Sequence, residues 1–117
     1  MASVANGEHK ELALQAARCA ETVLAFFTQE RPDDSRPKRA IEAARHWAAG
    51  ELSVADARKA AFAAHAAARE CSNPAATAAA RSAGHAAATS HVSTHAAIAE
   101  AYMKKAMTLK TGSKSMF

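Results

Sequence analysis

Four histidines in the second half of the chain are the side chains whose type and spacing could do chemistry: His65, His85, His91 and His95. Imidazole is a common metal ligand and titrates near neutral pH. His91 and His95 are four residues apart, so on one continuous helix they would face the same way. Such a pair is half of a zinc site, which needs three or four ligands. His65, His85 and Cys71 could complete it only if the helices that carry them converge.

The alternative for these histidines is a structural role. Partly buried imidazoles can bond to backbone carbonyls or to Ser and Thr hydroxyls. The chain has no HExxH, no CxxC and no carboxylate at ligand spacing, which are the patterns typical of a metal site. We therefore favour the structural role and expect no cofactor. A metal- or small-ligand-binding histidine cluster is the second interpretation, with His91 and His95 as the ligands of any metal.

Catalysis by a nucleophile requires a neighbouring base and a group that orients this base. Ser90 next to His91, and Cys71 near His65, have no such carboxylate nearby in the sequence. A glycine-rich phosphate loop is also missing from the sequence. The sequence therefore predicts that the protein is not an enzyme.

The charged segment ERPDDSRPKRAIE, residues 30–42, and the tryptophan that follows it supply a second set of candidates. Arg and Trp are enriched among the residues that dominate binding at protein interfaces. Arg39 and Trp47 are eight residues apart and share one helix face. We predict a partner-binding edge of Arg36, Arg39 and Trp47, with the arginines exposed and Trp47 mostly in the core. The alternative is a solvated connector, because exposed ion pairs contribute only about 0–1 kcal/mol each.

The helices that must position these residues can be placed from hydrophobic spacing and helix breakers. Alanine, the best helix former, dominates residues 53–109, and nothing alternates with the period of a strand. Pro, Gly and capping residues divide the chain into helices expected at 8–29, 36–49, 54–71, 74–90 and about 94–109. The predicted fold class is all-α, a compact bundle of about five helices packed through Ala-rich faces. Residues 8–110 form its single domain, between flexible ends at 1–7 and 111–117.

Gly84 falls inside the expected fourth helix. A glycine there costs roughly 1 kcal/mol of helix stability relative to Ala. We expect another backbone to pass very close to this position.

Composition and charge limit the partners. The 117 residues include 35 Ala against 15 Leu, Ile, Val and Phe together, which predicts a thin core that a protein partner or a second copy of the chain could stabilise. The net charge of +4 would suit nucleic acid, yet no nucleic-acid motif is present and carboxylates are interspersed. No apolar run reaches the roughly 18 residues of a membrane span, and the first residues do not form a secretory signal. Two cysteines without a CxxC pair fit reduced thiols, so we expect a cytoplasmic protein without a membrane partner.

Two stretches carry a resemblance to a known family. They are the RPxxAIExARxWAxGE pattern at Arg36 to Glu51 and the AGHAAATxHVxTHA pattern at Ala83 to Ala96. From about Leu12 to Met107, the chain resembles small all-helical bacterial immunity-like proteins, whose role is inferred from genome neighbourhoods. The resemblance implies a compact helical protein that binds and neutralises a toxin without chemistry of its own. Immunity proteins against nucleases are commonly acidic whereas this chain is basic, so the resemblance does not extend to phosphate mimicry.

Overall fold

The computed structural model describes residues 2–115, and the side chains between residues 7 and 111. Five α-helices follow one another in this part of the chain: α1 (Ala2–Glu30), α2 (Arg36–Ala48), α3 (Val54–Arg69), α4 (Pro74–Ala88) and α5 (His95–Ser115). The described residues contain no strand. The prediction of an all-α bundle of about five helices is confirmed.

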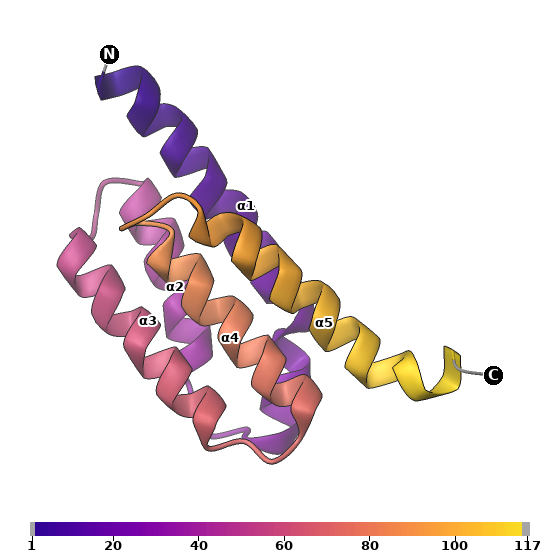
Figure 1. Ribbon diagram of the computed structural model, residues 1–117. Helices are drawn as coiled ribbons and strands as arrows, with labels where there is room; N and C mark the ends of the chain where they lie inside the picture. Colours follow the sequence, from indigo (N-terminus) through magenta and orange to yellow (C-terminus); the bar gives the residue numbers. More distant parts are fainter. Residues whose placement is uncertain (1, 116–117) are drawn as a thin grey trace.

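Helix α4 is the centre of the bundle, because it packs against all four other helices. In Figure 1 it runs between α3 and α5, while α1 and α2 lie behind this layer. The buried residues of α4 are all Ala, Ser or Gly. Side chains of this size let helix axes approach to the short end of the roughly 8–10 Å packing range. The predicted packing through Ala-rich faces is therefore realised on all the buried sides of α4.

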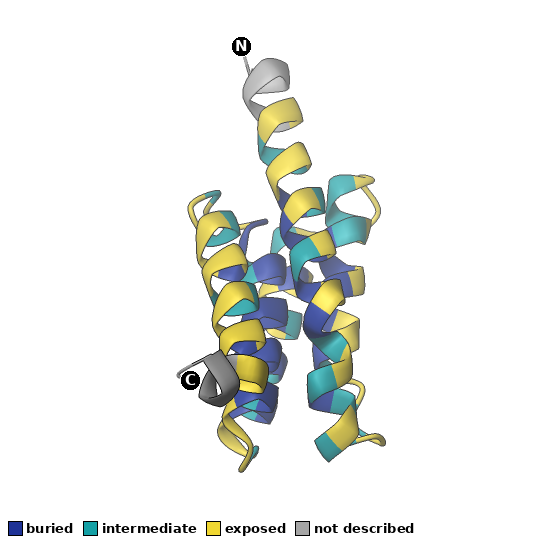
Figure 2. Cartoon of the chain, turned by 90° about the vertical axis from the view of Figure 1, so that its right-hand side faces the viewer, coloured by how far each residue is buried: buried dark blue, intermediate teal, exposed yellow. Residues whose placement is uncertain are grey.

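Helix α1 supplies the largest side chains of the core, as its spacing predicts. Val23 and Phe27 are fully buried, and Ile41 of α2 is almost so. The spacing in the sequence predicts one apolar stripe along α1, formed by Leu12, Ala16, Cys19, Val23 and Phe26. Leu12, at its start, is 36% exposed. The first turns of α1 extend beyond the other helices, and exposed residues cover much of this part (Figure 2). The stripe therefore reaches past the core that its C-terminal half fills.

The helix boundaries follow the expected caps. Ser53 accepts a hydrogen bond from the backbone N–H of Asp56, and Asn73 accepts two from the first turn of α4. Gly50 has a φ of +79°, the left-handed conformation expected after α2. The ends of the chain differ from the prediction. α1 starts at Ala2 and α5 ends at Ser115, and the helices continue through Gly7 and Gly112 because no Pro interrupts them. The flexibility assigned to residues 1–7 and 111–117 stays a prediction.

None of the helices in the described part combines the length and the apolar character that a membrane crossing requires. Cys19 and Cys71 are both free thiols and half-buried.

Gly84 does lie at a close approach, but its neighbour is a side chain. A Cβ at this position would sit 2.6 Å from Nε2 of His65, a residue of α3. The imidazole therefore occupies the space that any larger residue at position 84 would need. The expectation of a close backbone is replaced by a fit between Gly84 and the His65 ring.

We predict that Gly84→Ala destabilises the protein by about 1–3 kcal/mol, since overpacking forces the His65 ring to move. In a His65→Ala background the same change should stabilise by up to about 1 kcal/mol, because Ala is then only the better helix former. Urea unfolding of the four proteins of this cycle measures the coupling. Equal effects of Gly84→Ala in both backgrounds would contradict the fit.

Candidate functional site

A groove between α3 and α5 is the candidate site. These two helices flank α4 without contacting each other in the described part of the chain, so one face of α4 stays partly open between them. The half-buried residues of α4 lie on this face: Thr77, Arg81, His85 and Ala88. We call the space above them the α3/α5 groove.

Two cavities open along this face of α4: the first lies between α3 and α5, and the second is lined by α4, α5 and the α3–α4 turn. The first has a volume of about 260 Å³, and its lining includes Arg58, Phe62, His65, Ala88, His91 and His95. The second has about 450 Å³, and its lining includes Ser72, Thr77, Arg81, Tyr102, Lys105 and Leu109. Each cavity thus combines apolar surface with side chains that can donate hydrogen bonds.

Three of the four candidate histidines converge beneath the groove. The His85 ring meets His95 edge to edge, with centroids 5.0 Å apart, and is parallel to the Tyr102 ring, with centroids 5.4 Å apart. His95 and Tyr102 are two turns apart on α5, a rise of about 10.5 Å, so the His85 ring fits between them. The His65 ring meets His85 edge-on at 4.8 Å. These four rings, which we call the ring layer, connect α3, α4 and α5.

His91 does not join this layer. It lies in the turn between α4 and α5, is exposed, and lines the first cavity. Helix α5 begins only at His95. His91 and His95 therefore do not lie on one continuous helix, which was the condition for the two side chains to face the same way.

Hydrogen bonds define the protonation of the ring layer. Arg81 donates to Nδ1 of His65 over 2.9 Å. A guanidinium can only donate, so this Nδ1 is an acceptor and the His65 imidazole is neutral. The Nδ1 atoms of His85 and His95 lie 2.8 Å apart, so one of them must donate and the other accept. At least one of these two rings is therefore neutral as well.

Burial and neighbouring positive charge both lower the pKa of the His65 and His85 imidazoles. Burial, and then the charges of Arg81, Arg69 and His95, lower the pKa of His65 to about 4. Burial, and then His65, His95 and Arg81, lower the pKa of His85 to about 4. Both imidazoles are therefore uncharged at neutral pH.

This arrangement does not suit a metal ion. The Nδ1 lone pair of His65 accepts a hydrogen bond from Arg81, whose guanidinium repels a cation, and the Nδ1 atoms of His85 and His95 bind each other. No group of three or more His, Cys, Asp or Glu side chains that could hold a metal exists among residues that the structure describes. The geometry thus matches the structural interpretation of the histidines better than the zinc interpretation.

Two groove residues escaped the sequence analysis. Phe62 is 62% exposed, and the Arg58 guanidinium lies over its ring, 5.8 Å from the centroid. The buried residues of α3 are all alanines, and we call them its seam: Ala57, Ala61, Ala64, Ala67 and Ala68. Phe62 directly follows Ala61 of this seam. A large aromatic residue off the seam of an Ala-rich helix was the available signal, since the seam already shows which face is buried.

The three residues of the predicted partner-binding edge, Arg36, Arg39 and Trp47, differ in their exposure and contacts. Arg36 makes a short ion pair with Asp34 at 2.6 Å and another with Glu70 at 2.7 Å. Its side chain is 33% exposed, so the expectation that both arginines are exposed is wrong for Arg36. Arg39 is exposed as expected. Trp47 is half-buried, with its ring 4.7 Å from that of His9 on α1.

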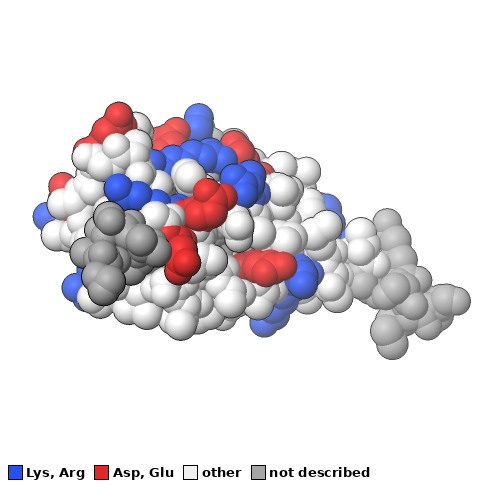
Figure 3. Space-filling view, turned by 90° about the horizontal axis from the view of Figure 1, so that it is seen from above, with Lys and Arg blue, Asp and Glu red and all other residues white. Residues whose placement is uncertain are grey.

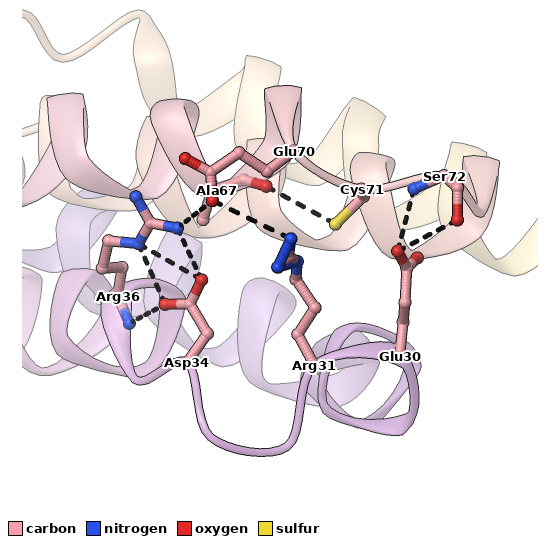
Figure 4. A network of polar contacts seen from close by, with 8 residues as sticks. All are labelled: Glu30, Arg31, Asp34, Arg36, Ala67, Glu70, Cys71 and Ser72. Carbon is pink, nitrogen blue, oxygen red and sulfur yellow. Dashed lines mark hydrogen bonds and ion pairs between the residues drawn. The ribbon is translucent and has the colours of Figure 1, made fainter.

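Arg36 and Glu30 join the α1–α2 turn to the α3–α4 turn (Figure 4). Arg36 reaches Glu70 at the end of α3, and Glu30 accepts hydrogen bonds from the backbone N–H groups of Ser72 and Asn73. The Arg36 guanidinium lowers the pKa of Asp34 and of Glu70. The hydrogen bonds from Ser72 and Asn73 lower that of Glu30. The charged segment is therefore a clamp between two turns.

A larger cavity of about 580 Å³ lies between α1 and α5. Its lining is mostly apolar and includes Leu12, Cys19, Met103 and Met107. Burial raises the pKa of the Cys19 thiol, which disfavours the reactive thiolate. This cavity offers apolar surface but none of the cation and aromatic pairs of the α3/α5 groove.

The sequence patterns and this fold agree with the comparison to known families. The model of the family described as Imm-5 like putative immunity protein matches residues 2–116. The chain belongs to this family. Among curated proteins and among solved structures, none matches it. The matched residues include the α1–α2 turn, the α3–α4 turn, the ring layer and the α3/α5 groove.

We predict that the protein loses stability as the pH falls from about 6.5 to about 4. The unfolded chain binds protons at His65 and His85 in this window, whereas the folded chain keeps both rings neutral. Each ring contributes up to about 1.4 kcal/mol per pH unit. Free energies of unfolding between about pH 6.5 and 5, where carboxylates stay ionised, measure the slope. His65→Gln and His85→Gln should each reduce it, and an unchanged slope in both would contradict this mechanism.

We predict that Arg36→Ala lowers the free energy of unfolding by about 1–2 kcal/mol, since it opens two ion pairs and leaves the largely buried Asp34 without its partner. Arg39→Ala is the matched control and should change stability by no more than about 0.5 kcal/mol. Urea unfolding at neutral pH compares the two. Equal small effects would show that the clamp contributes nothing.

Proposed function

We propose that this protein neutralises a toxin by binding it one to one, without chemistry of its own. Its membership in the Imm-5 like family supports an immunity role. The observation that carries the binding mode is the exposed Phe62 with Arg58 over its ring, at the mouth of a cavity in the α3/α5 groove. Exposed aromatic and Arg side chains beside a pocket are typical of the few residues that dominate a protein interface.

The chemistry of the groove favours binding over catalysis. Arg81 donates to the Nδ1 lone pair of His65, so this neutral imidazole has no free lone pair with which to act as a general base. Burial raises the pKa of the Cys71 thiol, which makes this candidate nucleophile less reactive at neutral pH.

Titration of a toxin with this protein tests the proposal. The candidates are toxins encoded near its gene, assayed by their own activity. A binder lowers toxin activity in proportion to the amount added and abolishes it near one equivalent. Loss of toxin activity at a small fraction of one equivalent would instead show that the protein acts as an enzyme.

Phe62→Ala should weaken the complex by about 2 kcal/mol or more, roughly thirtyfold in Kd. Because Phe62 is exposed, its loss should change stability by no more than about 0.5 kcal/mol. Calorimetric titration with the toxin measures the affinity. Met107→Ala, which removes an exposed residue of the α1/α5 cavity, and Arg39→Ala are the controls. A loss confined to either control would place the interface on that surface.

A further inference from the structure

The α3/α5 groove carries positive charge that the described part of the protein does not neutralise. Arg58 lines the first cavity, and Arg81 and Lys105 line the second. No Asp or Glu is among the described residues that line either cavity. Nor do the ion pairs of the described residues include any of these three cations.

The three cations are held by aromatic or imidazole rings. Arg58 lies over Phe62, and the Lys105 ammonium lies 5.8 Å from the centroid of Tyr102. Arg81 uses one nitrogen for His65, and a guanidinium has five N–H donors. Donors therefore remain at each cavity, and holding them in place reduces the entropy lost on binding.

The spacing of the cavities suggests the shape of the occupant. On α4, Ala88 belongs to the first cavity and Ala78 to the second, which places them about 15 Å apart along the helix. Two residues that are eleven positions apart on a partner helix are separated by about 16 Å and share one face. Ala88, a small and half-buried residue of α4, lines the first cavity and leaves space above this end of the helix.

We propose that the α3/α5 groove binds an acidic helical segment of the toxin, with one carboxylate at each cavity. This proposal rests on the proposed function and adds the chemistry of the partner. The carboxylates would be eleven residues apart, the first near Arg58 and the second near Arg81 and Lys105. Phe62 packs against the apolar part of the same helix face.

The surface favours protein over nucleic acid as the occupant. Figure 3 shows Lys and Arg interspersed with Asp and Glu over the end of the molecule that is seen from above. Nucleic acids are bound mainly through many phosphate contacts. Tyr102, the aromatic ring of the second cavity, is already stacked on His85, which leaves it less available for base stacking.

A helical peptide tests this inference without the toxin. The probe is an Ala-based peptide with two Glu residues eleven positions apart, added at millimolar concentration to the ¹⁵N-labelled protein. We expect chemical-shift changes at Arg81, His85 and Ala88. Two control peptides should bind more weakly: one with Gln in place of Glu, and one with its Glu residues about nine positions apart, on opposite helix faces. No shift changes at the groove, or equal binding of all three peptides, would overturn the proposal.

Charge reversal supplies matched variants. Arg58→Glu and Lys105→Glu should each weaken binding of the Glu peptide by about tenfold. Lys59→Glu and Lys104→Glu change the net charge equally at exposed neighbouring positions that do not line the cavities, and should have little effect. Equal losses in all four would show that net charge alone attracts the peptide.

Of three further outcomes, the first concerns nucleic acid, and the other two separate this inference from the proposed function. Tighter binding of a short DNA or RNA duplex than of the Glu peptide, lost in the same groove variants, would overturn the acidic helix in favour of nucleic acid. One-to-one toxin neutralisation that is unaffected by Arg58→Glu and Lys105→Glu would leave the proposed function in place and overturn the acidic helix. Peptide binding without toxin neutralisation would leave the acidic helix as the occupant of the groove and overturn the proposed function.

Discussion

The contact of α4 with all four other helices is the constraint on which the rest of the structure depends. The four neighbours can approach α4 closely because its buried side chains are Ala, Ser and Gly. Such packing gains little from each residue, because Ala buries little apolar area. Val23, Phe27 and Ile41 supply most of the bulk of the core from α1 and α2, behind the layer of α3, α4 and α5.

The open face of α4 is where this architecture creates a site. With α3 and α5 separated by α4, the half-buried residues Arg81 and His85 face a groove rather than a further layer of helices. The ring layer beneath this groove holds the three helices together through ring contacts and shared hydrogen bonds. Its neutral imidazoles keep further positive charge out of a groove that already has three cations. The same side chains therefore stabilise the fold and shape the candidate binding surface.

The two ends of the groove have different surroundings. Near the second cavity, Ser72 belongs both to the cavity lining and to the clamp, where Glu30 accepts its N–H. The clamp thus fixes the α3–α4 turn at this end. At the first cavity, the lining comes partly from the short turn with His91. An immunity protein that binds through this groove would have one end anchored by ion pairs and the other formed by exposed Phe62 and His91.

The sequence by itself determined the helices and their caps. Helical spacing, Pro74, Ser53, Asn73 and Gly50 are local signals, and local signals decide where a helix begins and ends. The family resemblance also depended on local patterns, and the match over residues 2–116 confirms it.

Only the tertiary structure decided which side chains meet. Arg36 pairs with Glu70, thirty-four residues away, so this residue of the predicted partner-binding edge also belongs to a clamp between two turns. His85 fits between His95 and Tyr102, whereas His91 lies outside the ring layer because the chain turns before α5. Phe62 and Arg58 became candidates once the open side of α3 was known. An Ala-rich sequence offers many equivalent faces, and the choice among them depends on packing between helices that are distant in sequence.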